Sequence, residues 1–175
     1  MKGMDTDVST VGLLGSTNTN GNILPLNLIQ QGNGSWNRVG RKTHLYSVRL
    51  KGNITFVYAP IVATGVLTVP ACRLVLVWDK QPSGGAIPTF DTIFGTTSQD
   101  GTESCPDVTC PLRYDNMDRF TVIKDMYFNS PCTTLTSTGS GPQTTSVVSM
   151  DEYVTLKTLE SVYSGQSSPM TILIS

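Results

Sequence analysis

A short basic segment contains the residues of this sequence that most clearly suggest chemistry. Between residues 38 and 51 lie five of the chain's twelve lysines and arginines and no acid. These five are Arg38, Arg41, Lys42, Arg49 and Lys51. Each cation could neutralise one phosphate, and such binding is independent of base sequence and weakens as salt rises. Trp36 and Tyr46 lie nearby in sequence and offer aromatic faces for base stacking, so the segment predicts a nucleic-acid contact that includes both.

The small net charge of the chain hides a strong asymmetry. The formal net charge is -1, yet residues 8–78 contain six lysines and arginines and no acid. Residues 79–175 contain eleven acids against five lysines and arginines. Such a distribution favours a polyanionic partner or a complementary copy of the same chain. A plainer alternative stays open, because cations on an exposed strand edge also protect that edge from aggregation.

Catalytic and metal chemistry have few candidate residues. His44 is the only histidine, and a serine or cysteine hydrolase would need a further residue to orient its imidazole. Asp115 and Asp118 are three residues apart, which is too few ligands for a calcium loop, so we expect solvated acids there. The sequence therefore predicts a protein that is not an enzyme and needs no metal or cofactor.

The four cysteines do not suggest a zinc site. Cys72, Cys105, Cys110 and Cys132 lack paired CxxC spacing and have one histidine to join them. Cys105 and Cys110 could bridge in an oxidising medium, but unpaired thiols are the simpler interpretation. No apolar run approaches the roughly 20 residues that cross a bilayer. The first residues also lack the features of a secretory signal, which favours the cytosol or nucleus.

The basic segment should be carried by a long strand. In residues 43–59 a period of two puts Leu45, Ser47, Arg49 and Lys51 on one face. The same period puts Tyr46, Val48 and Leu50 on the other face. One face of this strand is thus predicted to be basic and the other apolar.

The rest of the chain has the pattern of an all-β protein. Residues 1–21 are rich in Gly, Ser, Thr and Asn and predict a flexible arm, followed by one domain over 22–175. Further strands are expected within 22–32, 72–80, 119–128, 147–165 and 170–175. Residues 89–94 could form one or two helical turns capped by Thr89. Short strands and long loops predict a single jelly-roll β-sandwich of two antiparallel sheets with at most one short helix.

Three stretches of the sequence read RVGRKTHLYSVRLKGNITF, RLVLVWDKQPSGGAIPTFDTIF and NMDRFTVIKDMYF. In this order and spacing they resemble coat proteins of small circular single-stranded DNA viruses, the Rep-encoding group that includes geminiviruses. The resemblance implies a jelly-roll capsid subunit that assembles into an icosahedral shell around circular single-stranded DNA. It also implies that the basic residues face inward, with Arg38, Arg41 and Lys42 matching the family's basic entry to a strand and Arg49 and Lys51 continuing it.

The resemblance also implies where the protein acts and with which partners. These are further copies of the chain, single-stranded DNA and a host receptor, with no membrane, in the virion and in the host nucleus during assembly. Two features depart from the family. Its members usually begin with a long arginine-rich arm, whereas residues 1–37 contain only Lys2. Its members also close with a strand beyond the one that MTILIS resembles, so a strand is missing unless GVLTV fills one place.

A second function remains open on the sequence. A jelly roll can also be a ligand-binding module, lectin-like or receptor-binding, in which Trp36, Tyr58 or Tyr114 would hold the ligand.

Overall fold

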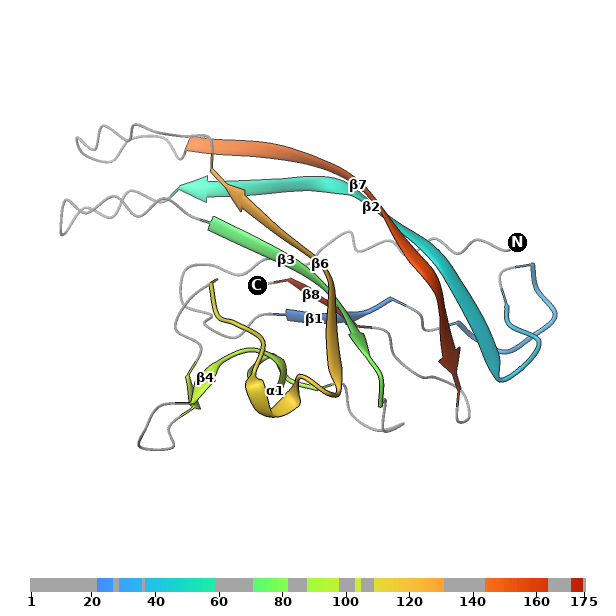
Figure 1. Cartoon of the computed structure of the whole chain (residues 1–175). Coiled ribbons are helices and arrows are strands. Elements are labelled where there is room, and N and C mark those ends of the chain that lie inside the picture. The colour runs from blue at the N-terminus through green and yellow to red at the C-terminus, as the bar shows by residue number, and fades with distance from the viewer. Residues whose placement is uncertain are drawn as a thin grey trace, which may run out of the picture.

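The computed structural model describes residues 22–26, 29–35, 37–58, 71–81, 88–97, 103–104, 109–130, 144–163 and 171–174. Most of them form strands (Figure 1). The strands are β1 (Asn22–Pro25), β2 (Lys42–Tyr58), β3 (Ala71–Asp79), β4 (Thr96–Thr97), β5 (Glu103–Ser104), β6 (Phe120–Asn129), β7 (Thr144–Val162) and β8 (Thr171–Ile174). The helical elements are α1 (Phe90–Ile93) and the 3-10 turn η1 (Tyr114–Asn116). The predicted arm, residues 1–21, lies outside the described residues and stays a prediction.

The described strands form two antiparallel sheets and a small hairpin. The larger sheet has the order β1-β8-β3-β6, the second sheet pairs β2 with β7, and β4 pairs with β5. Placing the first, third, sixth and eighth strands in one sheet and the second and seventh in the other is the order of a jelly roll. The predicted all-β sandwich is therefore confirmed. The hairpin of β4 and β5 lies outside the strands that the sequence predicts.

The last described strand occupies an inner position of the larger sheet. β8 pairs antiparallel with β1 on one side and with β3 on the other. The strand formed by MTILIS therefore fills the place between these two strands. Whether the family's closing strand has a counterpart is not tested by the described strands, and the departure stays an expectation. Residues 65–69, the GVLTV stretch, lie outside the described residues.

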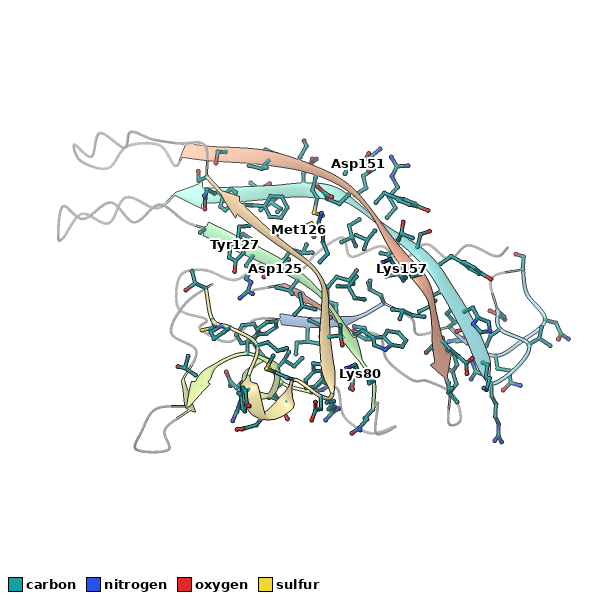
Figure 2. The ribbon with its side chains drawn as sticks, in the orientation of Figure 1. Lys80, Asp125, Met126, Tyr127, Asp151 and Lys157 are labelled. Atoms are coloured by element: carbon teal, nitrogen blue, oxygen red, sulfur yellow. The ribbon has the colours of Figure 1, made fainter. Side chains whose placement is uncertain are left out.

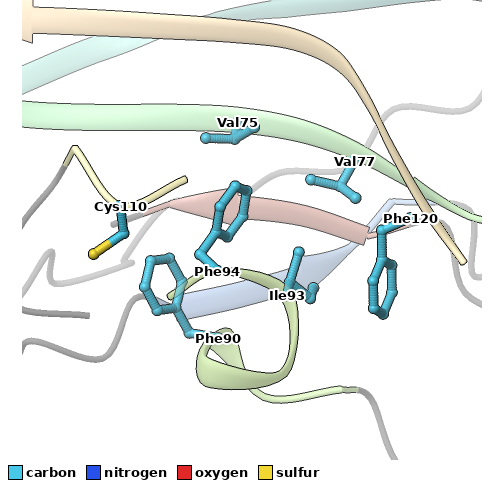
Figure 3. Close-up of a cluster of buried hydrophobic side chains, with 7 residues drawn as sticks. All are labelled: Val75, Val77, Phe90, Ile93, Phe94, Cys110 and Phe120. Carbon is cyan, nitrogen blue, oxygen red and sulfur yellow. The ribbon is translucent and has the colours of Figure 1, made fainter. Parts of the chain in front are cut away.

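β3 is buried on both faces because its apolar run is continuous. Leu74 and Leu76 point to one side and pack against β7 residues of the second sheet. Val75 and Val77 point to the other side and join the cluster around α1 (Figure 3). The other buried members of that cluster are Phe90, Ile93, Phe94, Cys110 and Phe120. The larger sheet is thus covered by β2 and β7 on one face and by α1 on the other.

The short helix lies where the sequence predicted it. α1 begins after Thr89, the predicted cap residue, and buries Phe90 and Ile93. The cap differs from the expectation, since the Thr89 side chain makes no capping hydrogen bond to the backbone. Its hydroxyl instead lies 2.9 Å from the hydroxyl of Thr92. Burial of the two apolar side chains, rather than capping, therefore holds this single turn in place.

Two ion pairs are built into the larger sheet. The Arg73 guanidinium donates to both carboxylate oxygens of Asp125, at 2.9 and 2.7 Å, and to the Cys110 carbonyl at 2.6 Å. Arg119 donates to both oxygens of Asp79 at 3.0 and 2.8 Å. The Asp79 side chain is 1% exposed and that of Arg73 is 6% exposed. These pairs link β3 to β6, to Arg119 directly before β6 and to the backbone at Cys110.

β2 and β7 form a long curved ribbon over the larger sheet (Figure 1). The ladder is interrupted between Leu45 and Ser47, where the register shifts. As a result Leu45 packs into the core with Val48, while Tyr46 is 50% exposed. The predicted alternation is correct for Ser47, Arg49 and Lys51, but it is wrong for Leu45 and Tyr46. The bulge adds residues to the ladder and so reverses the face on which the residues before it lie.

Candidate nucleic-acid interface

The outer face of the ribbon is the side of β2 and β7 that points away from the larger sheet. Figure 2 shows Asp151 on this side, whereas Met126 of β6 lies beneath the ribbon. Alternation of buried and exposed residues along both strands defines the face. Its exposed members on β2 are Lys42, His44, Tyr46, Ser47, Arg49, Lys51, Asn53 and Thr55. Those on β7 include Val147, Ser149, Asp151, Tyr153, Thr155, Glu160 and Val162.

Two of the predicted cations are paired with acids across this face. Arg49 donates to both carboxylate oxygens of Asp151, at 2.8 and 2.7 Å. Lys42 lies 2.6 Å from a carboxylate oxygen of Glu160. The hydrogen bond from Arg49 lowers the pKa of Asp151, and the hydrogen bond from Lys42 lowers that of Glu160. The basic half of the sequence and its acidic half therefore meet within one chain, along the β2–β7 ladder.

The outer face remains basic despite these pairs. Lys51 is also exposed on this face, and Arg41 is exposed directly before β2. Three predicted cations on the described outer face, with Arg41 beside it, thus stand against the two exposed acids Asp151 and Glu160. Lys51 borders a shallow hollow of about 290 Å³ that it lines with Gly52, Asn53, Ser149, Met150 and Asp151. Pockets that enclose small ligands usually measure roughly 300–1,000 Å³. The open hollow lies just below that range, so it does not have the size of a pocket that encloses a small ligand.

Aromatic rings stand between the charged groups. Tyr46 is brought to the outer face by the bulge, and Tyr153 is 67% exposed. Tyr153 is the direct cross-strand partner of Arg49. The predicted stacking residue Tyr46 thus shares a face with the cations, and a second exposed ring lies opposite Arg49. Trp36, the other predicted aromatic contact, lies outside the described residues.

Arg38 is not part of the outer face. It is 4% exposed, and its guanidinium donates to the carbonyls of Ile29 at 3.1 Å and Gly40 at 2.6 Å. The guanidinium carbon also lies 4.2 Å from the centroid of the Tyr163 ring. The backbone of Arg41 accepts a hydrogen bond from the Tyr163 amide at 2.8 Å. Arg38 therefore fixes the loop before β2 to the end of β7 and is removed from the predicted set of surface cations.

The candidates for catalysis and metal binding stay dispersed. His44 is exposed on the flat outer face, with Glu160 as its cross-strand partner. Asp115 lies 3.8 Å from Arg113, and Lys80 donates to the Asp118 backbone carbonyl at 3.1 Å. Within the part of the chain that the structure describes, no cluster of three or more His, Cys, Asp or Glu could hold a metal ion. The same residues include no helix long and apolar enough to cross a membrane.

The cysteines differ from the simplest expectation. Cys72 is a buried free thiol, and burial raises its pKa. Cys110 is disulfide-bonded, so the interpretation of unpaired thiols is wrong for this residue. Cys105 and Cys132 lie outside the described residues.

A jelly roll with a basic, aromatic outer face is consistent with the resemblance to virus coat proteins. The model of the geminivirus coat protein/nuclear export factor BR1 family matches residues 14–161. The chain belongs to this family. Among curated proteins, none matches the chain. Family membership makes it a geminivirus-like viral coat protein and a component of the virion, which favours a structural role over an enzymatic one.

The family match covers both strands of the outer face of this coat protein. Sequence reasoning found the β2 side of that face but missed Asp151, Tyr153 and Glu160 on β7. A signal was present, because Val147, Ser149, Asp151, Tyr153 and Thr155 alternate with residues that point inward. The pairing of β7 with β2, which brings these residues beside the cations, spans about a hundred residues of sequence and has no local signature.

Proposed function

We propose that this coat protein assembles with copies of itself into an icosahedral shell and contacts enclosed single-stranded DNA through the outer face of β2 and β7. The observation that carries the proposal is the combination on one face of Lys42, Arg49 and Lys51 with the exposed rings of Tyr46 and Tyr153. Arg41 is exposed directly before β2 and adds a fourth cation beside this face. Cations that track a backbone and rings that stack bases are the two parts of a single-strand binding surface.

The jelly-roll fold supports the assembly part of the proposal. The two described sheets bury a shared core between them, which leaves the outer face of β2 and β7 exposed for contacts. Copies that meet head to tail generate closed rings and shells when the rotation between them closes. We further propose that assembly takes place in the host nucleus, where single-stranded DNA of such viruses would be available.

Particle formation tests the assembly part. The full chain is expressed and examined by electron microscopy and light scattering, and closed particles far larger than a subunit are expected. A protein that stays monomeric or dimeric under all salt conditions would contradict a shell.

Nucleic-acid content tests the DNA contact. A variant with Arg41, Lys42, Arg49 and Lys51 changed to glutamine should retain less nucleic acid in purified particles, measured by the ratio of absorbance at 260 and 280 nm. The matched single comparison is Lys51→Gln against Lys80→Gln, because both lysines are exposed and only Lys51 lies on the outer face. Equal nucleic-acid content in these two variants and in the wild type would place the DNA contact elsewhere.

A further inference from the structure

The acids of the outer face are attached to the very cations that the proposed DNA contact requires. Asp151 occupies both donor groups on one edge of the Arg49 guanidinium. One carboxylate oxygen of Glu160 lies 2.6 Å from the Lys42 ammonium and occupies one of its donors. A phosphate that approaches either cation must therefore compete with a carboxylate already in place. Of the four surface cations, two are occupied in this way.

These exposed pairs can be opened at little cost to the fold. The side chains of Arg49 and Asp151 are 60% and 47% exposed, and those of Lys42 and Glu160 are 64% and 40% exposed. Water already solvates such groups well, so exposed ion pairs contribute little to stability. Their role in holding the sandwich together is therefore minor, and a different role has to explain why they lie on this face.

Phosphate is a suitable replacement for either carboxylate. An arginine binds phosphate with the same pair of parallel N–H donors that it uses for a carboxylate. Each exchange frees a carboxylate to water and leaves its negative charge near the incoming strand. The acids thus weaken nucleic-acid binding in two ways. They occupy a cation, and they repel the phosphate backbone.

We propose that Asp151 and Glu160 limit the affinity of the outer face for single-stranded nucleic acid, and that Tyr153 is a base-stacking residue of the same site. This inference rests on the proposed function. Tyr153 lies opposite Arg49 on the neighbouring strand, so a phosphate on Arg49 would place the adjoining base over its exposed ring. Bases of a duplex are already stacked on one another, so a ring on an open face selects single strands.

The acids are tested by removing their charge while keeping their shape. Asp151→Asn and Glu160→Gln should each tighten binding of fluorescein-labelled oligo-thymidine, measured by anisotropy across a salt series. One additional phosphate contact steepens the dependence of log affinity on log salt by about 0.7, equivalent to roughly fivefold at 0.1 M salt. Asp115→Asn is the matched control, because it removes one exposed acid from η1 and should change affinity less. Equal gains in all three variants, or no gain in the first two, would overturn the assignment.

The stacking role is tested with Tyr153→Ala and Tyr153→Phe. Loss of one stacked base is worth roughly tenfold or more in affinity, which the alanine variant should lose and the phenylalanine variant should keep. Tyr114→Ala is the control, since Tyr114 is 87% exposed and lies on η1, away from the ribbon. Wild-type affinity in Tyr153→Ala, or an equal loss in Tyr114→Ala, would remove Tyr153 from the site.

Lys51→Gln separates failure of this inference from failure of the proposed function. If Lys51→Gln weakens binding while Asp151→Asn and Glu160→Gln do nothing, the outer face binds DNA but the acids do not limit it. If Lys51→Gln is also without effect on binding, the outer face does not bind DNA and the proposed DNA contact is wrong. Weaker binding in Lys51→Gln together with tighter binding in the two acid variants supports both.

Discussion

The two sheets use the same kind of ion pair in opposite surroundings. In the larger sheet, Arg73 and Asp125 meet with the arginine side chain 6% exposed. On the outer face of the ribbon, Arg49 and Asp151 meet with the same bidentate geometry but with both side chains about half exposed. A buried charge that loses its partner cannot recover its solvation, whereas an exposed one can. The buried pair therefore fixes the structure, whereas the exposed pair can be exchanged for a ligand.

The largest effect is expected when a buried pair is broken. Arg73→Leu leaves the Asp125 carboxylate without its donors and the Cys110 carbonyl without its 2.6 Å hydrogen bond. Removing one partner of a buried pair costs about 3–5 kcal/mol, and the partial exposure of Asp125 places this variant at the lower end. Urea unfolding measures the loss. Arg49→Leu is the matched control, and an equal shift of the unfolding midpoint in both variants would erase the distinction between the two sheets.

A smaller loss is expected at Arg38, the cation of the basic segment that belongs to the buried class. Arg38→Ala removes two hydrogen bonds to backbone carbonyls and the contact with the Tyr163 ring. We expect a loss of about 1–2 kcal/mol in the free energy of unfolding, because two partly buried hydrogen bonds and the contact of the guanidinium with the Tyr163 ring are lost. Arg38→Lys keeps the charge but cannot reproduce the planar arrangement of donors. If Arg38→Lys is as stable as the wild type, charge rather than geometry fixes this loop.

Acid titration tests the exposed pair of Arg49 and Asp151. The pKa of Asp151 lies below its ordinary value of 3.8, chiefly through the hydrogen bond from Arg49. The pKa of this carboxylate is lower in the folded state than in the unfolded state. The pair therefore contributes its full, small stabilisation at pH values above the unfolded pKa. It is lost as pH falls through the folded pKa. An NMR titration of the Asp151 carboxyl should show the lowered pKa in the wild type and a return toward 3.8 in Arg49→Gln. An unchanged pKa in this variant would mean that the pair does not form in solution.

The positions of the strands could be predicted from the sequence much better than the face on which each side chain lies. β2, β3, β6 and β7 follow apolar or alternating runs, because burial of one or both faces imposes that pattern along the strand. The bulge beside Tyr46 and the burial of Arg38 were not foreseen, since both depend on contacts with the distant end of β7. For the same reason the β2 cations could be found from the sequence, while Asp151 and Glu160, which pair with two of them, could not.

The smallest predicted effect concerns the backbone that forms the bulge. Lys157 is the one described residue other than glycine with a positive φ, at 48°, and it lies in β7 where the ladder with β2 is irregular. This conformation costs an L-residue about 1 kcal/mol and costs glycine almost nothing. Glycine also gains freedom in the unfolded chain, which offsets part of the benefit. Lys157→Gly should therefore match or slightly exceed the wild type in the free energy of unfolding measured in urea.

Lys51→Gly, at an ordinary strand position of the same ribbon, is the control and should lose about 0.5–1 kcal/mol. Equal losses in the two glycine variants would show that residue 157 is not held in this conformation in solution, and that another feature brings Tyr46 to the outer face.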